Sequence, residues 1–263
     1  MLPTQGPPPP TAGPTAPLSE FGKFPRNRSH TPPETLRLVE QAGVAKTRLT
    51  WVDLIVKSFL GGVFISLGSA FDLIVDGGSP GLRSSNPAMA MLVASFTFPI
   101  GFVVIILTSL ELSTSNMFVM AYATLRRRIT LYDLARNWIM SYVFNVAGCL
   151  FYAGVLCWWS DTLETDAQSS YAVTQAERRI PIWAFVAMRY QHSVANYFMV
   201  PIGMFYGTNF GVGKFIWASC IPVTLGNIVG GAVFCGLAMW VMYGRYQPSV
   251  HDPRMHEDDS HRV

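Results

Sequence analysis

Residues 192–199, HSVANYFM, decide the fold of this chain, and residues 113–120, STSNMFVM, are a shorter echo of them. Both copies read S-x-x-N-x-F and lie in the middle of a long apolar stretch, where polar atoms are costly because no bulk water can bond them. Two apolar segments interrupted at matching places by small and polar residues are typical of the substrate site of a transporter. His192 is the only histidine in the apolar body of the chain, so we expect the chemistry there.

Composition sets the class of protein. The 263 residues are 50% hydrophobic and 13% charged, whereas soluble domains carry about 25% charged residues. Four runs contain no Asp, Glu, Lys or Arg, and each exceeds the ~20 residues that cross a bilayer as a helix: 84–110, 137–160, 190–213 and 215–244. The sequence therefore predicts an all-α, multi-pass protein of the lipid bilayer.

Other functional classes find no support. Basic residues are not interleaved with aromatic residues on a polar face, which argues against nucleic acid as a partner. No nucleophile-base pair and no metal-ligand spacing appears, so we predict neither an enzyme nor a cofactor. The cysteines are expected to be reduced packing residues because they form no CxxC motif; they are Cys149, Cys157, Cys220 and Cys235.

The chain divides into four regions. Residues 1–30 form a Pro-rich tail, which we expect to be disordered. Residues 31–47 predict an amphipathic helix capped by Thr31 and Glu34, lying either on the membrane surface or in the cytoplasm. Residues 48–244 form the transmembrane channel domain, and 245–263 form a charged tail.

Five spans are apparent in the channel domain. Plain spans are predicted at 51–75, 137–159 and 215–243, and interrupted spans at 86–120 and 180–206, with a polar external loop over 160–179. The second span is too long for one straight crossing, so we expect a half-helix, a loop and a second half-helix. Lys46, Arg48 and the three arginines at 126–128 favour the cytoplasm for both the amino terminus and the end of this span.

An internal repeat accounts for this pattern. NVAG at 145–148 matches NIVG at 227–230 with an offset of 82 residues, and Asn116 matches Asn196 with an offset of 80. Two agreeing offsets indicate one duplicated unit of three spans, and an odd number makes the copies inverted. The second copy lacks its plain span, because the polar residues between 159 and 180 cannot cross a membrane.

Several stretches resemble the formate/nitrite transporter family, and in particular a eukaryotic nitrite-type member without its fourth span. They are LTSLELSTSNMFVM, RRRITLYDLARNW, YQHSVANYFMVPIG, IPVTLGNIVGG and, for the amino-terminal helix, TPPETLRLVEQAG. The resemblance implies an aquaporin-like fold with six spans where this chain shows five. It also implies a homopentamer of the plasma membrane that passes protons and small monovalent anions, nitrite or formate, through one pore per protomer.

The resemblance also assigns roles to residues. His192 is expected to be the central pore histidine, faced by the loop residues Leu112, Ser113 and Thr114, and Asn227 is expected to bond near this site. An apolar constriction on the outer side is expected from Phe98, Phe102 and Phe185. Ser113 stands where bacterial members often have Phe, Arg189 stands where Gly is usual, and the missing span falls between Glu177 and Pro181.

The residues themselves suggest further roles in the loops of the broken helices. Thr114 and Ser115 either satisfy backbone groups or contact substrate, with neither reading preferred. Asn116 and Asn196 are expected to bond backbone, and Glu111 to pair with an amide or a cation. Histidine exists in either protonation state near neutral pH, so His192 can lower the desolvation cost of an anion by donating a hydrogen bond or a proton.

The alternative is a truncated, non-conducting isoform of such a transporter, or a faulty gene model of one. If the fourth span is missing, counting the remaining spans from a cytoplasmic amino terminus places Arg245 outside. The same count inverts the segment around His192, so that the two broken helices no longer face each other. A re-entrant path for residues 180–198 is the alternative topology.

Overall fold

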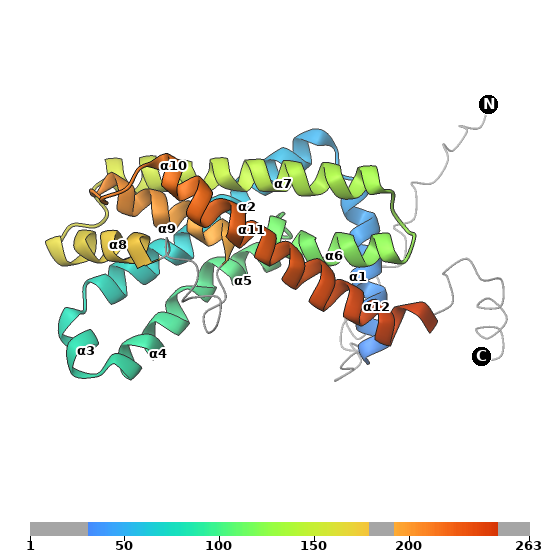
Figure 1. Ribbon diagram of the computed structural model, residues 1–263, viewed down its shortest axis with the longest axis horizontal. Coiled ribbons are helices and arrows are strands. Elements are labelled where there is room, and N and C mark those ends of the chain that lie inside the picture. Colours follow the sequence, from blue (N-terminus) through green and yellow to red (C-terminus); the bar gives the residue numbers. More distant parts are fainter. Residues whose placement is uncertain (1–30, 179–191, 247–263) are drawn as a thin grey trace, which may run out of the picture.

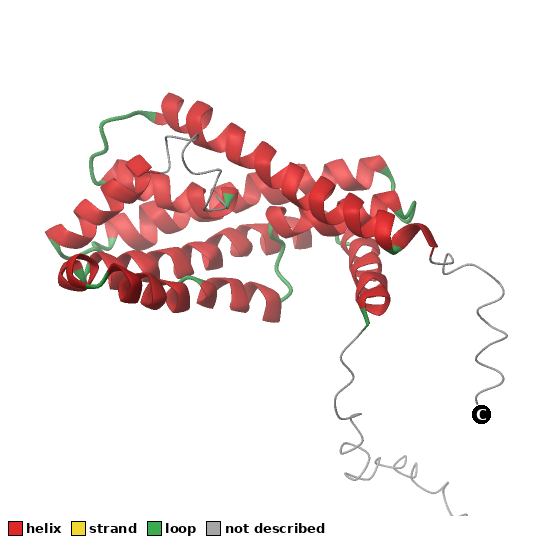
Figure 2. Cartoon of the chain, turned by 60° about the horizontal axis from the view of Figure 1, so that its bottom comes forward, coloured by secondary structure: helices red, strands yellow, loops and turns green. Residues whose placement is uncertain are grey.

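The computed structural model describes residues 31–178 and 192–246 of the chain, and these residues are helical, with no strand among them (Figures 1 and 2). Four helices are long and apolar enough to cross a membrane: Trp51–Gly77, Pro87–Leu107, Leu131–Trp159 and Val212–Met242. The prediction of an all-α membrane protein is confirmed. Phe185, Arg189, residues 1–30 and residues 247–263 lie outside the described part.

The amino-terminal helix α1 (Pro32–Thr47) begins as predicted. The Thr31 side chain accepts from the backbone of Glu34, and the Glu34 carboxylate accepts from the backbone N–H of Thr31 at 2.8 Å. The helix packs on α6 (Ser113–Leu125), where the buried carboxylate of Glu40 pairs with Arg126 and Arg128, each at 2.9 Å. Protein contacts therefore fix α1 in place.

The first interruption includes Glu111 and Leu112, as predicted, but residues 113–116, which were expected in the loop, form the first turn of α6. After α2 (Trp51–Gly77) and the short α3 (Pro80–Ser85), helices α4 (Pro87–Thr97) and α5 (Pro99–Leu107) lead to a non-helical loop, residues 108–112, and then to α6. The first piece is longer than the expected half-helix. Pro99 bends it without ending it, because a proline in the first turn of a helix loses no hydrogen bond.

The predicted loop over 160–179 is wrong. After α7 (Leu131–Phe151) and its continuation η2 (Tyr152–Trp159), residues Asp166–Arg178 form helix α8. Thr165 and Gln168 cap its start through backbone–side-chain bonds of 3.1 and 3.2 Å. The composition is polar, but Ala172 and Ala176 lie directly on Gly203 of α9 (Ser193–Phe205), where any Cβ would clash. Small residues at a spacing of four allow this close helix contact.

The positions of α8 and α9 differ from the topology that was expected from counting the membrane spans. Gln168 near the start of α8 bonds Ile74 O near the end of α2 at 3.1 Å, and Phe205 at the end of α9 stacks on Trp158 at 5.7 Å. Both helices thus have their outer ends at the end of the molecule opposite α1 (Figure 1). This is the re-entrant arrangement.

The last span then returns to the α1 end. It consists of α10 (Val212–Phe215), η3 (Ile216–Cys220), α11 (Ile221–Ile228), η4 (Val229–Leu237) and α12 (Ala238–Met242), followed by the 3₁₀ turn η5 (Gly244–Tyr246). The Arg126 guanidinium donates to Gly244 O. Arg245 therefore lies on the same side as α1, and the expectation that it lies on the opposite side is wrong.

The core is centred on α9. Val194, Tyr197, Phe198 and Met199 are buried, because α2, α7, α8 and η2 surround this helix. The second S-x-x-N segment is consequently the most enclosed helix among the described residues.

We predict that residues 127 and 245 are labelled from the same side of the membrane. In a background with Cys220 and Cys235 replaced by Ser, Arg127→Cys and Arg245→Cys should react with an impermeant maleimide from one side. Glu164→Cys, an exposed site at the far end, should react from the other. Labelling of position 245 together with position 164 would contradict the re-entrant arrangement.

Candidate functional site

The starts of two short helices meet inside the molecule. The backbone N–H of Ser113, the first residue of α6, donates to Asn145 Oδ1 at 2.8 Å. The backbone N–H of Ser193, the first residue of α9, donates to Asn227 Oδ1 at 2.8 Å. The first N–H groups of a helix have no partner within it, and each asparagine supplies one. The S-x-x-N and N-x-x-G motifs of the sequence therefore form two matching pairs.

His192 joins the two helix starts. Its Nε2 lies 2.8 Å from Thr114 Oγ1, and its Nδ1 accepts from the backbone N–H of Ala195 at 3.2 Å, which makes His192 the N-cap of α9. A nitrogen that accepts carries no hydrogen, so the neutral ring has its hydrogen on Nε2 and donates it to Thr114. The expectation that the broken helices no longer face each other is wrong.

The electrostatics of this arrangement favour an anion. α6 leads from the site towards the α1 end, and α9 leads towards the opposite end (Figure 1). Each helix has 13 residues and turns its amino terminus to the site. Helix amino termini carry a partial positive charge and outward N–H groups. Two of them facing one point attract anions and repel cations.

Glu111 holds the loop before α6, residues 108–112, in position through hydrogen bonds to three other segments. Its carboxylate is buried and accepts from Lys46 Nζ at 2.7 Å, Asn116 Nδ2 at 2.8 Å and Asn137 Nδ2 at 3.4 Å. Its backbone oxygen accepts from Asn145 Nδ2 at 2.9 Å. Glu111 thus pairs with both a cation and amides, as predicted. Asn116 was expected to bond backbone, but its amide bonds this carboxylate instead.

The other residues expected in the two interruptions divide by role, and all except Leu112 lie in the first turn of α6 or α9. Ser115 Oγ donates to Leu112 O at 2.9 Å and so satisfies the freed backbone, while Thr114 turns to His192. Leu112 and Ser113 are buried. The amide of buried Asn196 donates to Ser219 Oγ at 3.4 Å. These contacts assign Ser115 to a backbone group and Thr114 to His192, whereas the sequence left the roles of these two residues open.

The aromatic residues of the expected constriction do not form a cluster in the described structure. Phe98 is half-buried and packs against the core, whereas Phe102 is 39% exposed and lies at the edge of a pocket. Phe185 lies outside the described residues. A constriction built from these three residues stays a prediction.

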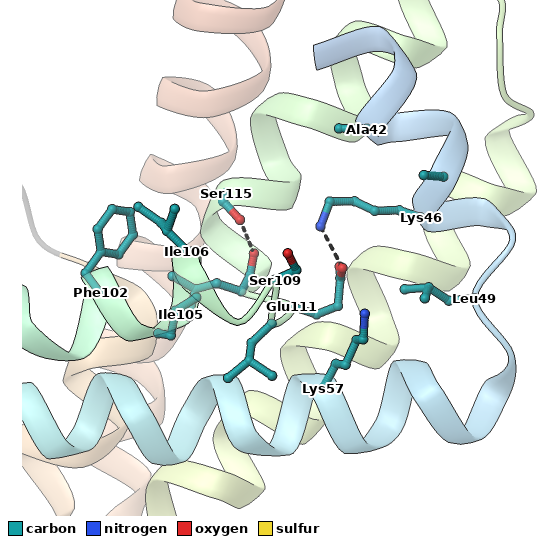
Figure 3. A pocket seen from close by; sticks show the side chains of 13 residues that line it. Ala42, Lys46, Leu49, Lys57, Phe102, Ile105, Ile106, Ser109, Glu111 and Ser115 are labelled. Carbon is teal, nitrogen blue, oxygen red and sulfur yellow. Dashed lines mark hydrogen bonds and ion pairs between the residues drawn. The ribbon is translucent and has the colours of Figure 1, made fainter. Parts of the chain in front are cut away.

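A pocket of about 360 Å³ borders the loop before α6, between α1, α2 and α5 (Figure 3). Lys57 points into it beside the Lys46–Glu111 pair, and Leu112 and Ser115 are also among the lining residues. Sequence analysis did not name Lys46 or Asn145 as site residues. The signal for Asn145 was present in the N-x-x-G repeat, whereas nothing local in the sequence pairs Lys46 with Glu111, 65 positions later.

Comparison with known proteins agrees with this geometry. The family described as "Formate/nitrite transporter" matches residues 33–180 and 178–241. The uncharacterized transporter YrhG of Bacillus subtilis is 31% identical over 252 residues, covering 81% of this chain and 93% of YrhG. A probable formate transporter of Methanothermobacter thermautotrophicus is 29% identical over 270 residues, covering 81% and 97%.

Two solved structures share the fold. An "FNT family ion channel" aligns with a TM-score of 0.66 and 21% identity over 79% of this chain and 98% of that channel. A "pentameric formate channel with formate bound" aligns with a TM-score of 0.59 and 20% identity over 73% and 97%.

The alignment with YrhG also includes positions that have no counterpart in this chain. The one with YrhG extends over 252 positions but takes in 81% of this chain. Roughly 40 of those positions, about one membrane-crossing helix with its connections, therefore have no residue of this chain opposite them. The two matching parts of the family description meet at residues 178–180, where the sequence predicted a missing span. Together with the opposed helix starts around His192, these matches place the chain in the formate/nitrite transporter family, whose members are membrane channels and transporters.

Proposed function

We propose that this protein passes small monovalent anions, nitrite or formate, across the plasma membrane through a pore at His192, in a homopentamer. The observation that carries the proposal is the His192–Thr114 contact between two opposed helix starts. The family and the printed names of relatives that are formate channels or transporters support the substrate class.

The barrier for such an ion is desolvation. Moving a small anion into an apolar environment costs many kcal/mol unless hydrogen bonds replace its water. His192 Nε2–H and the Thr114 hydroxyl are donors at the meeting point of two positive helix ends, and an anion that separates them accepts from both. In the structure the Nε2–H of His192 donates to Thr114 Oγ1, so an anion must break this bond before it accepts from both groups.

Proton linkage follows from the same histidine. A doubly protonated ring needs a hydrogen on Nδ1, which now accepts from Ala195 N–H. Protonating His192 therefore breaks the cap of α9. We infer that the ring donates a proton to a weak-acid anion only while this cap is open, and that protonation and movement at the start of α9 are linked.

We propose that the pocket beside the loop is the approach for anions from the α1 end. Lys57 has no ion pair with another described residue, and Lys46 is bound to Glu111. Cations in a recess raise the local concentration of anions. We propose that this charge delivers anions to the loop past Phe102 at the edge of the pocket, and that Phe98 and Phe185 contribute to the apolar constriction on the other side of His192.

A second candidate is a protein that does not conduct because one span is missing. The two-part family match and the positions of YrhG without a counterpart favour it. The intact contact between His192 and Thr114 favours conduction. Flux through the purified chain distinguishes the two functions.

We predict that proteoliposomes containing the chain take up nitrite or formate and exclude sulfate. One neutral imidazole and one hydroxyl do not offset the desolvation of two charges. The measurement is isotopic uptake with empty liposomes as the control. Sulfate uptake at the rate of nitrite would contradict the proposed pore, and absence of all flux would favour the non-conducting protein.

Replacing His192 by Asn should remove the stimulation of uptake by external acid. Asn keeps a donor but does not titrate. The assembly should persist, as judged by size-exclusion chromatography in detergent. His251→Asn is the matched control and should keep the acid response. If His192→Asn still responds normally to acid, His192 is not the proton-exchanging group.

Thr114→Val should slow uptake about tenfold or more, because it removes one of the two donors proposed to replace the water of the anion, and a hydrogen bond to a charged group contributes about 1.5–3 kcal/mol. The shape of the side chain is kept. Thr124→Val is the control on the same helix, since Thr124 Oγ1 only bonds Met120 O one turn back at 2.8 Å. Equal rates for the two variants would exclude Thr114 from the anion path.

A further inference from the structure

Two glycines on the last span present bare backbone to the outside of the molecule. Gly226 and Gly230 are four residues apart, and a Cβ built on either would meet no atom within 4 Å. The span that carries them is the least covered of the four membrane helices, with 6% of its apolar window buried against 50% for α2. Glycines at this spacing in a membrane helix let another helix approach closely.

The first repeat shows what covers this position. Gly148 on α7 is the counterpart of Gly230, since Asn145 and Asn227, three residues before them, make the same 2.8 Å bond to a helix start. A Cβ on Gly148 would clash with Phe59 O of α2, so the backbone of α2 lies directly on this glycine. The face that is open in the second repeat is thus filled by a plain span in the first.

The contact in the first repeat is mutual. A Cβ on Gly62 of α2 would clash with Asn145 O of α7, and one on Gly61 would clash with Glu111 O in the loop. α2 therefore meets α7 through small residues of its own. A helix that fills the open face needs the same chemistry: an apolar span with glycine or serine along the contact.

The described chain holds no helix for this place. Its four long apolar helices already have positions, and α8 packs against α9 and α2. Residues 179–191 number 13, fewer than the ~20 that cross a bilayer.

We propose that the face of the last span formed by Gly226 and Gly230 is the docking site for one additional transmembrane helix, built like α2 and supplied by a polypeptide other than a second copy of this chain. Such a helix completes the second repeat from outside the chain. Lipid is the less suitable neighbour, because acyl chains gain little from a flat glycine surface, whereas a helix with small residues reaches backbone contact. The proposal does not depend on transport.

A synthetic peptide with the α2 sequence, residues 51–77, tests the proposal in proteoliposomes. The exposed Cys235 carries a fluorophore in a Cys220→Ser background, and the peptide carries a quencher. Reconstitution inserts the peptide in both directions, which matters because the second repeat is inverted. We expect saturable quenching by the α2 peptide, and at least tenfold weaker quenching by a peptide with Gly61→Leu and Gly62→Leu.

Variants of the protein locate the binding site. Gly230→Leu should weaken peptide binding at least tenfold, and Gly226→Leu should act in the same way. Ile221→Phe adds bulk at an exposed position on another side of the helix and should have no effect. Leucine on an open face should not destabilise the fold. The midpoint of the thermal unfolding transition in detergent checks this expectation.

Three results would overturn the proposal. Equal quenching by both peptides, or quenching unchanged by Gly230→Leu and Gly226→Leu, means that the face meets lipid. Absence of saturable quenching by either peptide means that no helix binds. In a further experiment, some copies of the chain carry the fluorophore and others carry the quencher. If these copies quench one another and Gly230→Leu abolishes the quenching, a second copy of the chain occupies the face instead.

Discussion

The backbone groups at the start of two half-helices are the constraint on which the structure depends. A buried N–H without a partner costs about 1–3 kcal/mol, and more where lipid excludes water. Asn145 and Asn227 remove this cost for Ser113 and Ser193 with bonds of 2.8 Å. Because each asparagine stands on a neighbouring long helix, the same bonds fix where the two half-helices start.

The preference of the site for an anion follows from the positions of these two helix starts. Two helix starts can face each other only if something neutral or negative lies between them, since their positive ends repel. The neutral His192–Thr114 pair occupies that place. Glu111, buried beneath the loop and bonded to Lys46, extends the arrangement to α1. A change at the α1 end is thereby connected to the loop that positions Thr114.

Much of this arrangement could be predicted from the sequence, and the failures have physical causes. The offsets between the S-x-x-N and N-x-x-G motifs indicate an internal repeat, so the break after α5 follows from residue types, whereas the meeting of Thr114 with His192 was expected only from the resemblance to the family. Helix α8 could not be predicted in the same way. Its polar composition is typical of a loop, and its stability comes from Ala172 and Ala176 on Gly203, a contact that exists only in three dimensions. The expectation that Arg245 lies opposite α1 was wrong for the same reason, because the packing of α8 on α9 that turns the chain back cannot be read from the sequence. Likewise, Asn116 bonds a carboxylate that only the fold brings near.

The hydrogen position on His192 tests the central claim most directly, because the claim is that α9 holds this ring as a neutral donor towards Thr114. Solid-state NMR of the ¹⁵N-histidine-labelled protein in lipid at neutral pH, with His192→Asn as the subtraction control, measures which ring nitrogen is protonated. We predict the hydrogen on Nε2 and a bare Nδ1 that accepts from Ala195 N–H. A hydrogen on Nδ1 with a bare Nε2 would contradict the account, because the ring could then neither cap α9 nor donate to Thr114.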